Sequence, residues 1–262
     1  MLPIGERYTW QRVVSALRRS LMLITSMSLA SPAFSQDVDS TRSRTVVEGL
    51  MTVTNKGISN VPSITLGKPA AILNVSIARS GFAFEPELKY GLNGKPWSFI
   101  FWGRYKLDRD KFHLTIGEHP SVNFKTITVS VNQTQRDVIE ARRFLAGELY
   151  PSFSVSSYVG IGAYYLYSRG LDPDIAKNTH FLALRTTFSN VPRSDGYSVR
   201  FVPQVYWLKQ DARDGTYGNC ILTFGKRDLP LSIGAQVNKT IRTSILEGDD
   251  FIWNVSLSYS IK

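Results

Sequence analysis

Hydrophobic and polar residues alternate along most of this chain. From residue 71 onward it consists of segments about ten residues long, separated by short runs of Gly, Asn, Asp and Pro. In each segment nearly every second side chain is apolar, and the last segment, "FIWNVSLSYSI", shows this most clearly. A period of two is typical of β-strands that have one apolar and one polar face.

The stretch "SFIFWGRYKL" first looks contradictory, because a strongly apolar run leads directly into basic residues. The alternation resolves it: Phe99 and Phe101 fall on one face, and Arg104 and Lys106 on the other. We therefore expect a two-sided strand, with one face toward an apolar solvent and one toward a polar space.

The pattern predicts an all-β fold, a closed antiparallel transmembrane β-barrel of about twelve strands. The predicted strands are about 71–78, 82–91, 96–107, 112–117, 121–131, 138–150, 154–168, 177–189, 196–208, 216–225, 230–241 and 250–261. An even number suits a closed barrel with both termini on one side. The longest connections, about 169–176, 209–215 and 242–249, are expected on the outer side, and the turn 92–95 on the periplasmic side.

Two places in the sequence do not fit this alternation. The predicted fifth strand changes phase between Phe124 and Ile127, which favours a β-bulge there. Arg143 falls on the lipid-facing phase, where an arginine at the bilayer midplane would cost about 2 to 4 kcal/mol. We therefore expect Arg143 near the outer interface.

Soluble sandwiches and barrels also have half-polar strands, but three features favour a membrane barrel. The chain begins with an export signal, and the strands reach the roughly 9 to 11 residues that a tilted crossing needs. Aromatic residues also lie where girdles at two membrane interfaces would place them: Tyr90 and Trp97 flank one turn, Phe251 and Trp253 open the last strand, and Tyr259 lies near its end.

The N-terminal residues predict export through the cell envelope. Residues 1–35 combine basic residues, a short apolar core and a small-residue site at Ala33-Phe34-Ser35, as a cleaved signal peptide does; a retained amphipathic helix is the alternative. Residues 36–70 are expected to form an irregular leader, periplasmic or inside the lumen, and residues 71–262 the barrel. Cys220 is the only cysteine, so no intramolecular disulfide is possible.

The formal net charge is +10, and removal of the signal, with four arginines and one glutamate, lowers it to +7. The basic residues are scattered singly, which argues against nucleic-acid binding. No segment after the signal has the roughly 18 to 20 continuous apolar residues of a spanning helix.

Four stretches, "GKPWSFIFWGRYKL", "ARRFLAGELYP", "KNTHFLALRTTFSN" and "FIWNVSLSYSIK", carry a resemblance from about Gly57 to Lys262. Together they resemble a family of uncharacterised outer-membrane β-barrel proteins of Bacteroidota-type Gram-negative bacteria. The resemblance implies the fold and the cell outer membrane, and it implies no activity. Outer-membrane barrels commonly end in an aromatic residue, whereas this chain ends Tyr259-Ser260-Ile261-Lys262.

Catalytic and metal chemistry have few candidates. An outer-membrane lipase needs a Ser or Thr nucleophile beside a base, and the three histidines fall on the polar face (His113), in an expected periplasmic turn (His119) and on the lipid phase near the outer rim (His180). A structural role is favoured for each. No two histidines share a face at ligand spacing, so we expect no metal and no cofactor.

The polar face carries a set of charged side chains that we expect to line the lumen: Glu85, Glu87, Lys89, Arg104, Lys106, Lys125, Glu140, Arg142, Glu148, Arg185 and Arg200. Pairing about the 92–95 turn places Glu85 opposite Trp102 and diagonal to Arg104. The set either pairs with itself or forms a mildly cationic wall that attracts small anions. Acid–base catalysis by Glu85 with Glu87, or Glu140 with Glu148, is the weakest interpretation.

Three function classes follow, in decreasing order of support. The first is a small passive channel for ions or small polar solutes. The second is an occluded structural or interaction barrel that contacts an envelope protein, and the third is a lipid-modifying enzyme that depends on His113 or His180. The expected partners are outer-membrane lipid and lipopolysaccharide, and the barrel-assembly machinery during insertion.

Overall fold

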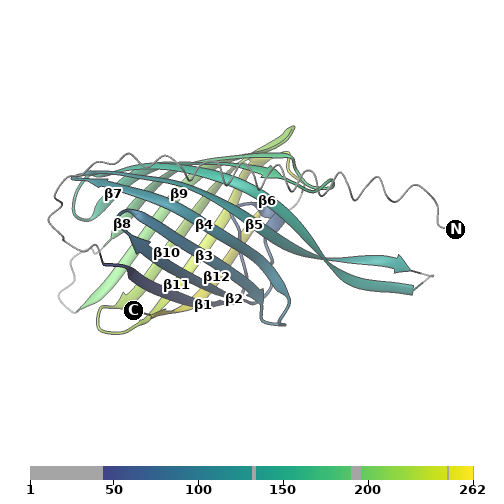
Figure 1. Ribbon diagram of the computed structural model, residues 1–262, viewed down its shortest axis with the longest axis horizontal. Coiled ribbons are helices and arrows are strands. Elements are labelled where there is room, and N and C mark those ends of the chain that lie inside the picture. The colour runs from purple at the N-terminus through teal and green to yellow at the C-terminus, as the bar shows by residue number, and fades with distance from the viewer. Residues whose placement is uncertain (1–43, 132–133, 190–195, 247, 262) are drawn as a thin grey trace, which may run out of the picture. The chain divides into compact units, whose positions relative to one another are not determined.

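The structure, a computed structural model, describes residues 44–131, 134–189, 196–246 and 248–261, and its fold is a closed antiparallel β-barrel of twelve strands (Figure 1). The predicted signal peptide lies outside the described residues. The strands are β1 (Val46–Thr54), β2 (Ala70–Arg79), β3 (Phe82–Gly91), β4 (Pro96–Arg109), β5 (Phe112–Val131), β6 (Thr134–Ser154), β7 (Val159–Gly170), β8 (Asn178–Ser189), β9 (Tyr197–Gln210), β10 (Arg213–Lys226), β11 (Leu231–Thr243) and β12 (Phe251–Ile261). A short 3-10 helix, η1 (Pro62–Ile64), lies between β1 and β2.

Each strand pairs with its neighbours in sequence, and β1 closes the barrel by pairing with β12, for example Met51 with Tyr259. The barrel has two rims. We call the terminal rim the one where β1 begins and β12 ends, with the connections 80–81, 110–111, 155–158 and 227–230. We call the loop rim the opposite one, with the connections 55–69, 92–95, 171–177, 211–212 and 244–250.

The outer surface of the barrel is apolar. Along β12 the outward residues Phe251, Trp253, Val255 and Leu257 are each about half exposed, and the other strands repeat this pattern. An exposed apolar surface of this extent is not typical of a protein in water, because soluble monomers rarely expose contiguous apolar patches beyond a few hundred Å². Among the described residues, no helix has the length and hydropathy to cross a membrane.

Outward aromatic residues gather near both rims, as membrane girdles do. Those near the loop rim include Tyr90, Phe99, Phe124, Trp207, Phe251 and Trp253, and those near the terminal rim include Phe82, Tyr105, Phe112, Phe153, Tyr197, Phe224 and Tyr259. Trp97 was predicted to belong to a girdle, and this is wrong. A register shift between Lys89 and Tyr90 turns Trp97 toward the interior, where it is buried.

Part of the segment predicted as an irregular leader is a strand of the barrel wall. β1 pairs with β2 along its whole length, from Val46 with Ala78 to Thr54 with Ala70. Its alternation is hard to see in the sequence because Gly49 falls on the outer face and Leu50 on the inner face. The barrel therefore begins at residue 46 rather than 71, and its first strand covers the polar edge that β2 would otherwise expose.

The two strands predicted at 112–117 and 121–131 are one strand, β5, which pairs continuously with β6. The sequence "GEHP" was interpreted as a turn, but Pro120 only interrupts the ladder with β4. Glu118 faces outward between Gly103 of β4 and Gly147 of β6, its partners in register. The prediction missed β1 and divided β5 into two strands. These two errors compensate, so the predicted count of twelve strands is right.

Because β1 was missed and β5 was divided, the connections before residue 132 were grouped with the wrong rim. The turn 92–95, predicted on the periplasmic side, lies on the same rim as 171–177, 211–212 and 244–250. From residue 132 onward the grouping of the connections agrees with the prediction.

Beyond the loop rim, β5 and β6 continue as a two-stranded ribbon (Figure 1). Residues 124–131 and 134–143 pair only with each other, since β4 reaches no farther than Asn123 and β7 no farther than Phe144. The β5–β6 ladder has no register shift, so the predicted bulge is wrong. The phase of the sequence changes because this part of the strand has left the barrel wall.

Arg143 lies where the prediction placed it, at a rim of the barrel rather than halfway along its apolar outer surface. Its side chain reaches the 171–177 connection, where Nη2 donates to Asp172 Oδ1 at 2.6 Å and the backbone N–H of Arg143 donates to Asp172 Oδ2 at 2.6 Å. The charge is thereby paired outside the strands.

Candidate functional site

An ion-paired cluster crosses the interior on β3, β4 and β6, with Arg104 at its centre. Arg104 Nη1 donates to Glu85 Oε2 and its Nε donates to Glu148 Oε1, both at 2.6 Å. Lys106 Nζ lies 2.5 Å from Glu85 Oε1, and Tyr164 Oη donates to Glu148 Oε2 at 2.8 Å. Glu85 lies opposite Trp102 in the β3–β4 ladder and bonds diagonally to Arg104, as the turn geometry predicted.

Gly117 makes this cluster possible. It lies on β5 opposite both Arg104 and Glu148, so the ion pair between them passes directly over it. A Cβ at this position would stand 2.9 Å from Glu148 Oε1 and 3.0 Å from Arg104 Cγ. Only glycine leaves room for a bond between alternate strands.

The remaining charged candidates have separate environments. Lys89 Nζ lies 2.5 Å from Glu87 Oε1, and Arg142 Nε donates to Glu140 Oε2 at 2.7 Å. Lys125 is opposite Glu140, in the ribbon rather than in the barrel wall. Glu87 and Glu140 therefore each have a cation of their own. Neither of the pairs considered for acid–base catalysis, Glu85 with Glu87 or Glu140 with Glu148, meets on a common cation or site.

Two inward arginines have no carboxylate partner among the described residues. Arg185 Nε donates to Gln204 Oε1 at 3.0 Å, and its guanidinium lies 5.5 Å from the Tyr150 ring centroid. Arg200 lies opposite Ser189, close to the terminal rim. These two residues are the uncompensated positive charge of the inward-facing candidate set.

A ladder of aromatic rings lines one side of the interior, and no sequence motif marked it. It runs across consecutive strands through Tyr150, Tyr164, Phe181, Tyr206 and Tyr217, with neighbouring centroids 4.8 to 5.9 Å apart. Phe181, Tyr206 and Tyr217 belong to a buried hydrophobic cluster that also includes Ile245. Val61 packs against this cluster. The signal was present only as one inward aromatic residue on each of five successive strands.

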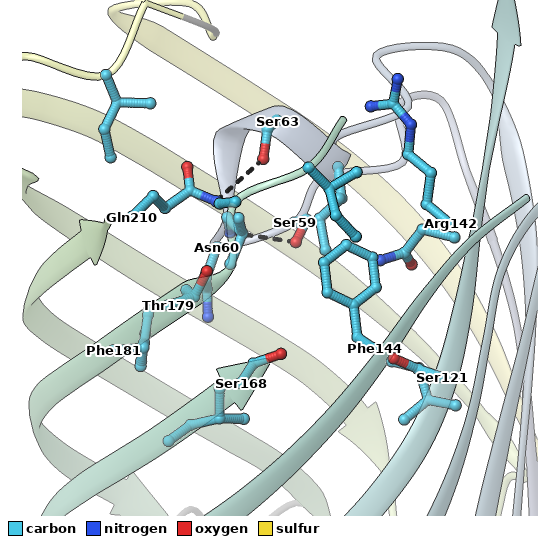
Figure 2. Close-up of a pocket in the computed structure, with 18 of the residues that line it drawn as sticks. Ser59, Asn60, Ser63, Ser121, Arg142, Phe144, Ser168, Thr179, Phe181 and Gln210 are labelled. Carbon is cyan, nitrogen blue, oxygen red and sulfur yellow. Dashed lines mark hydrogen bonds between the residues drawn. The ribbon is translucent and has the colours of Figure 1, made fainter. Parts of the chain in front are cut away.

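Val61 belongs to the connection 55–69, which lies in the mouth of the barrel at the loop rim. Trp97 Nε1 donates to Ile64 O at 2.8 Å, and Asn254 Nδ2 donates to Lys56 O at 2.9 Å. Gln210 Nε2 lies 3.4 Å from Ser63 Oγ (Figure 2). The connection is therefore anchored to β4, β9 and β12 and occupies part of the opening.

Beneath this connection is a cavity of about 780 Å³. Residues 58–61, 63 and 64 line one side, as Figure 2 shows in part. Side chains of β3 to β11 and of the connections 171–177, 211–212 and 244–250 line the rest. Glu87, Lys89 and Arg142 of the predicted lumen set reach it, whereas Glu85, Arg104 and Glu148 do not. Its wall is mixed, with apolar residues such as Phe144 beside polar ones such as Ser121 and Asn123.

The histidines lie in three different settings. His119 was predicted in a turn and instead lies on β5, buried and facing the cavity, with its ring centroid 4.0 Å from that of Trp102. His180 faces outward near the loop rim, where its Nδ1 lies 2.9 Å from Tyr165 Oη. Among the described residues, no three His, Cys, Asp or Glu side chains gather as a metal site.

His113 lies at the terminal rim between two polar partners. Its Nδ1 lies 2.7 Å from Asp108 Oδ1, and its Nε2 lies 2.9 Å from Ser154 Oγ. This is the order of atoms in a Ser–His–Asp relay. No sequence motif indicates this contact between His113 and Ser154, because Ser154 comes 41 residues after His113 and reaches it only through the β5–β6 pairing.

Two aspartates, Asp172 and Asp211, stabilise the connections of the loop rim by accepting hydrogen bonds. Arg143 donates hydrogen bonds to Asp172 and thereby lowers the pKa of that carboxyl below its ordinary value. Burial by itself would raise the pKa of Asp211, but backbone N–H groups of Asn178 and Lys177 donate to its carboxylate and lower it. Both groups are therefore anchors in their ionised form.

The fold is similar to those of solved outer-membrane channels. The structure of the KdgM porin in complex with disordered oligogalacturonate matches with a TM-score of 0.52 at 12% identity, covering 82% of this chain and 99% of that one. An outer-membrane channel from Pseudomonas putida F1 matches with a TM-score of 0.52 at 10% identity, covering 88% and 98%. No protein-family model and no curated protein matches the chain in sequence. At these identities the likeness shows a porin-like outer-membrane β-barrel fold.

Proposed function

We propose that this protein is an outer-membrane channel that passively conducts ions or small polar solutes. The observation that carries the proposal is the contrast between the two faces of one closed wall. The outside is an apolar belt with two aromatic girdles, and the inside holds ion pairs, amides and a cavity. Such a wall separates lipid from a polar interior. The similar structures that are channels support the same function.

In this proposal the loop rim faces outward and the terminal rim faces the periplasm. Outer-membrane barrels have short periplasmic turns and longer outer connections, and the longest connection here, 55–69, belongs to the loop rim. The apolar belt would contact membrane lipid, and the loop rim would contact lipopolysaccharide. The barrel-assembly machinery would insert the barrel into the membrane. The β5–β6 ribbon is the surface that an envelope protein would reach most readily.

The charged set would make the lumen mildly cationic. Glu85, Glu87, Glu140 and Glu148 are each paired with a cation, which leaves Arg185 and Arg200 as the uncompensated charges of this set inside the barrel. Uncompensated positive charge in a narrow passage favours small anions. The alternative, an occluded interaction barrel, is supported by the 55–69 connection in the mouth.

Conductance in a planar bilayer decides between these two functions. The purified, folded barrel should give discrete single-channel currents in KCl, with a reversal potential that shows weak chloride preference. Replacing Arg185 and Arg200 together with Gln should abolish the preference and leave the barrel folded. A barrel that shifts its mobility on unheated gels, as folded barrels do, but never conducts would leave the occluded alternative.

One observation favours a second candidate function, hydrolysis of an ester by Ser154. Ser154 Oγ would attack the carbonyl carbon while His113 Nε2 takes its proton, and that proton would then go to the departing alcohol. Water would hydrolyse the acyl group from Ser154 and release the acid. Asp108 would hold the imidazole through Nδ1, although its side chain is 77% exposed, which weakens such an interaction.

A fluorophosphonate probe tests this second candidate directly, since it labels only activated serines. Labelling of the folded barrel should be lost in Ser154→Ala and in His113→Ala. Ser152→Ala is the matched control, because Ser152 lies opposite His113 in the ladder but does not bond to it. Absent labelling of the wild-type barrel, or labelling retained in Ser154→Ala, would remove the hydrolase function and leave the channel untouched.

A further inference from the structure

The cavity in the mouth contains polar side chains that are buried without a hydrogen-bond partner. His119 and Asn123 are 6% and 8% exposed, and both line the cavity. His119 Nδ1 and Asn123 Oδ1 have no partner within the described residues, and neither has Asn60 Oδ1 from the covering connection. Leaving such atoms unbonded is unfavourable, because each has given up its hydrogen bond to water. A ligand that hydrogen-bonds to them would replace those lost bonds.

These atoms surround an aromatic ring. Phe144 lies directly opposite Ser121 in the β5–β6 ladder, and His119 and Asn123 lie two residues to either side of Ser121 on the same face. Ser121 is itself buried and lines the cavity (Figure 2). Unlike the five rings of the aromatic ladder, Phe144 makes no ring contact within the described residues. Phe144 is half-buried and lines the cavity, so part of its ring is accessible to a ligand.

The charges nearby do not favour an ion at this position. The cavity is lined by the cations Lys89, Arg142 and Arg213 and by the carboxylates Glu87, Asp174 and Asp211, so its charged lining residues balance one another. Lys89 is also paired directly with Glu87, and Arg142 with Glu140. Amide, hydroxyl and imidazole groups together donate and accept hydrogen bonds, which matches hydroxyl groups better than carboxylates. A ring with an apolar face and hydroxyl groups at its edge satisfies both Phe144 and its polar border.

We infer that the cavity is a binding site for an uncharged hydroxylated ring compound, with Phe144 as its stacking platform and His119, Ser121 and Asn123 as its polar border. The volume of about 780 Å³ lies within the 300 to 1,000 Å³ typical of small-molecule sites. The inference deepens the proposed channel function, because a solute held here would sit in the mouth before it crosses. A sugar and a phenol share this chemistry, and the experiment separates them.

Two measurements on the full barrel test the site. In detergent micelles, calorimetry with methyl β-D-glucopyranoside, phenol and benzoate should show saturable binding of one or both uncharged compounds and at least tenfold weaker binding of benzoate. In a planar bilayer, the compound that binds should reduce the ion current with the same concentration dependence.

Matched variants assign the site. Phe144→Leu keeps apolar volume but removes the ring, and Asn123→Ala removes the amide; each should weaken binding about tenfold, as expected when about 1.4 kcal/mol is lost. Phe188→Ala, on the outer face, should bind as the wild type does, and the gel mobility shift confirms folding of each variant.

The outcomes separate the two proposals. A barrel that conducts but binds neither uncharged compound, or binds benzoate best, overturns this inference and leaves the channel function in place. A barrel that binds through Phe144 but never conducts retains the site and removes the channel function. Binding unchanged in both Phe144→Leu and Asn123→Ala places the compound elsewhere and also overturns the inference.

Discussion

Arg104 and Glu148 form an ion pair across an intervening strand. Arg104 Nε donates to Glu148 Oε1 at 2.6 Å although β5 separates β4 from β6. Gly117 on β5 permits this bond by having no side chain. The interior of the barrel is therefore braced by side chains as well as by its backbone ladder.

Gly117→Ala should break this brace. The new Cβ would also stand 3.1 Å from the carbonyl oxygen of Gly103, which is backbone and cannot swing away. We expect the free energy of unfolding to fall by about 1 to 3 kcal/mol, measured by urea unfolding of the barrel in lipid vesicles. Gly160→Ala is the control, since the nearest atom to its Cβ would be Phe153 O at 3.8 Å. Equal stability of the two variants would show that the brace contributes nothing.

Glu118→Leu should stabilise the barrel. Glu118 faces outward in the part of β5 that pairs with β4, with Gly103 and Gly147 as its neighbours in register. A carboxylate in the lipid belt is unfavourable, and replacing it with an apolar side chain should raise the free energy of unfolding by roughly 1 to 2 kcal/mol in the same assay. A loss of stability would mean that Glu118 has a partner in the membrane.

Trp97→Phe should loosen the connection 55–69. The change keeps the aromatic packing but removes the donor to Ile64 O, a bond worth about 0.5 to 1.5 kcal/mol. Single-channel conductance should rise or become noisier as the connection leaves the mouth more often. Trp207→Phe, on the outer face near the loop rim, removes an indole hydrogen bond to Asp214 instead and should conduct as the wild type does. If the two variants give the same conductance, the connection does not obstruct the passage.

The Arg143–Asp172 pair predicts a pH dependence. Arg143 donates to the carboxylate, so the pKa of Asp172 lies below the ordinary 3.8. The contribution of a depressed carboxyl to stability is fully present above its ordinary pKa and is lost as the pH falls through the depressed value. A ¹³C carboxyl NMR titration in micelles should show the low pKa, and Arg143→Gln should return it toward 3.8. A pKa of Asp172 that Arg143→Gln leaves unchanged would contradict the pairing.

The alternation of side chains predicted most of the fold, because lipid on one side and a polar interior on the other constrain nearly every residue of a wall strand. It failed where that constraint is absent. Gly49 and Leu50 blur the pattern in β1, and Pro120 resembles a turn although the strand continues through it. The ribbon of β5 and β6 has neither lipid nor lumen beside it, so its phase carries no information about the barrel.

The site was less predictable than the fold. Spacing within one hairpin was enough to bring Glu85 to Arg104, but the contacts of Arg104 with Glu148 and of His113 with Ser154 depend on the pairing of β5 with β6. The false turn at His119 and Pro120 hid that pairing. The cavity, its polar border and the connection that covers it all follow from closure of the barrel by β1.

The central claim is that lipid surrounds the outward residues while the alternate residues face a polar interior. Nitroxide labels at Ser256, Leu257 and Ser258, introduced singly into Cys220→Ala barrels in vesicles, test it most directly by their collision rates with oxygen and with a water-soluble nickel complex. The account predicts high oxygen access at Leu257, and high nickel access at Ser256 and Ser258. Equal access at all three positions, or nickel access greatest at Leu257, would contradict it.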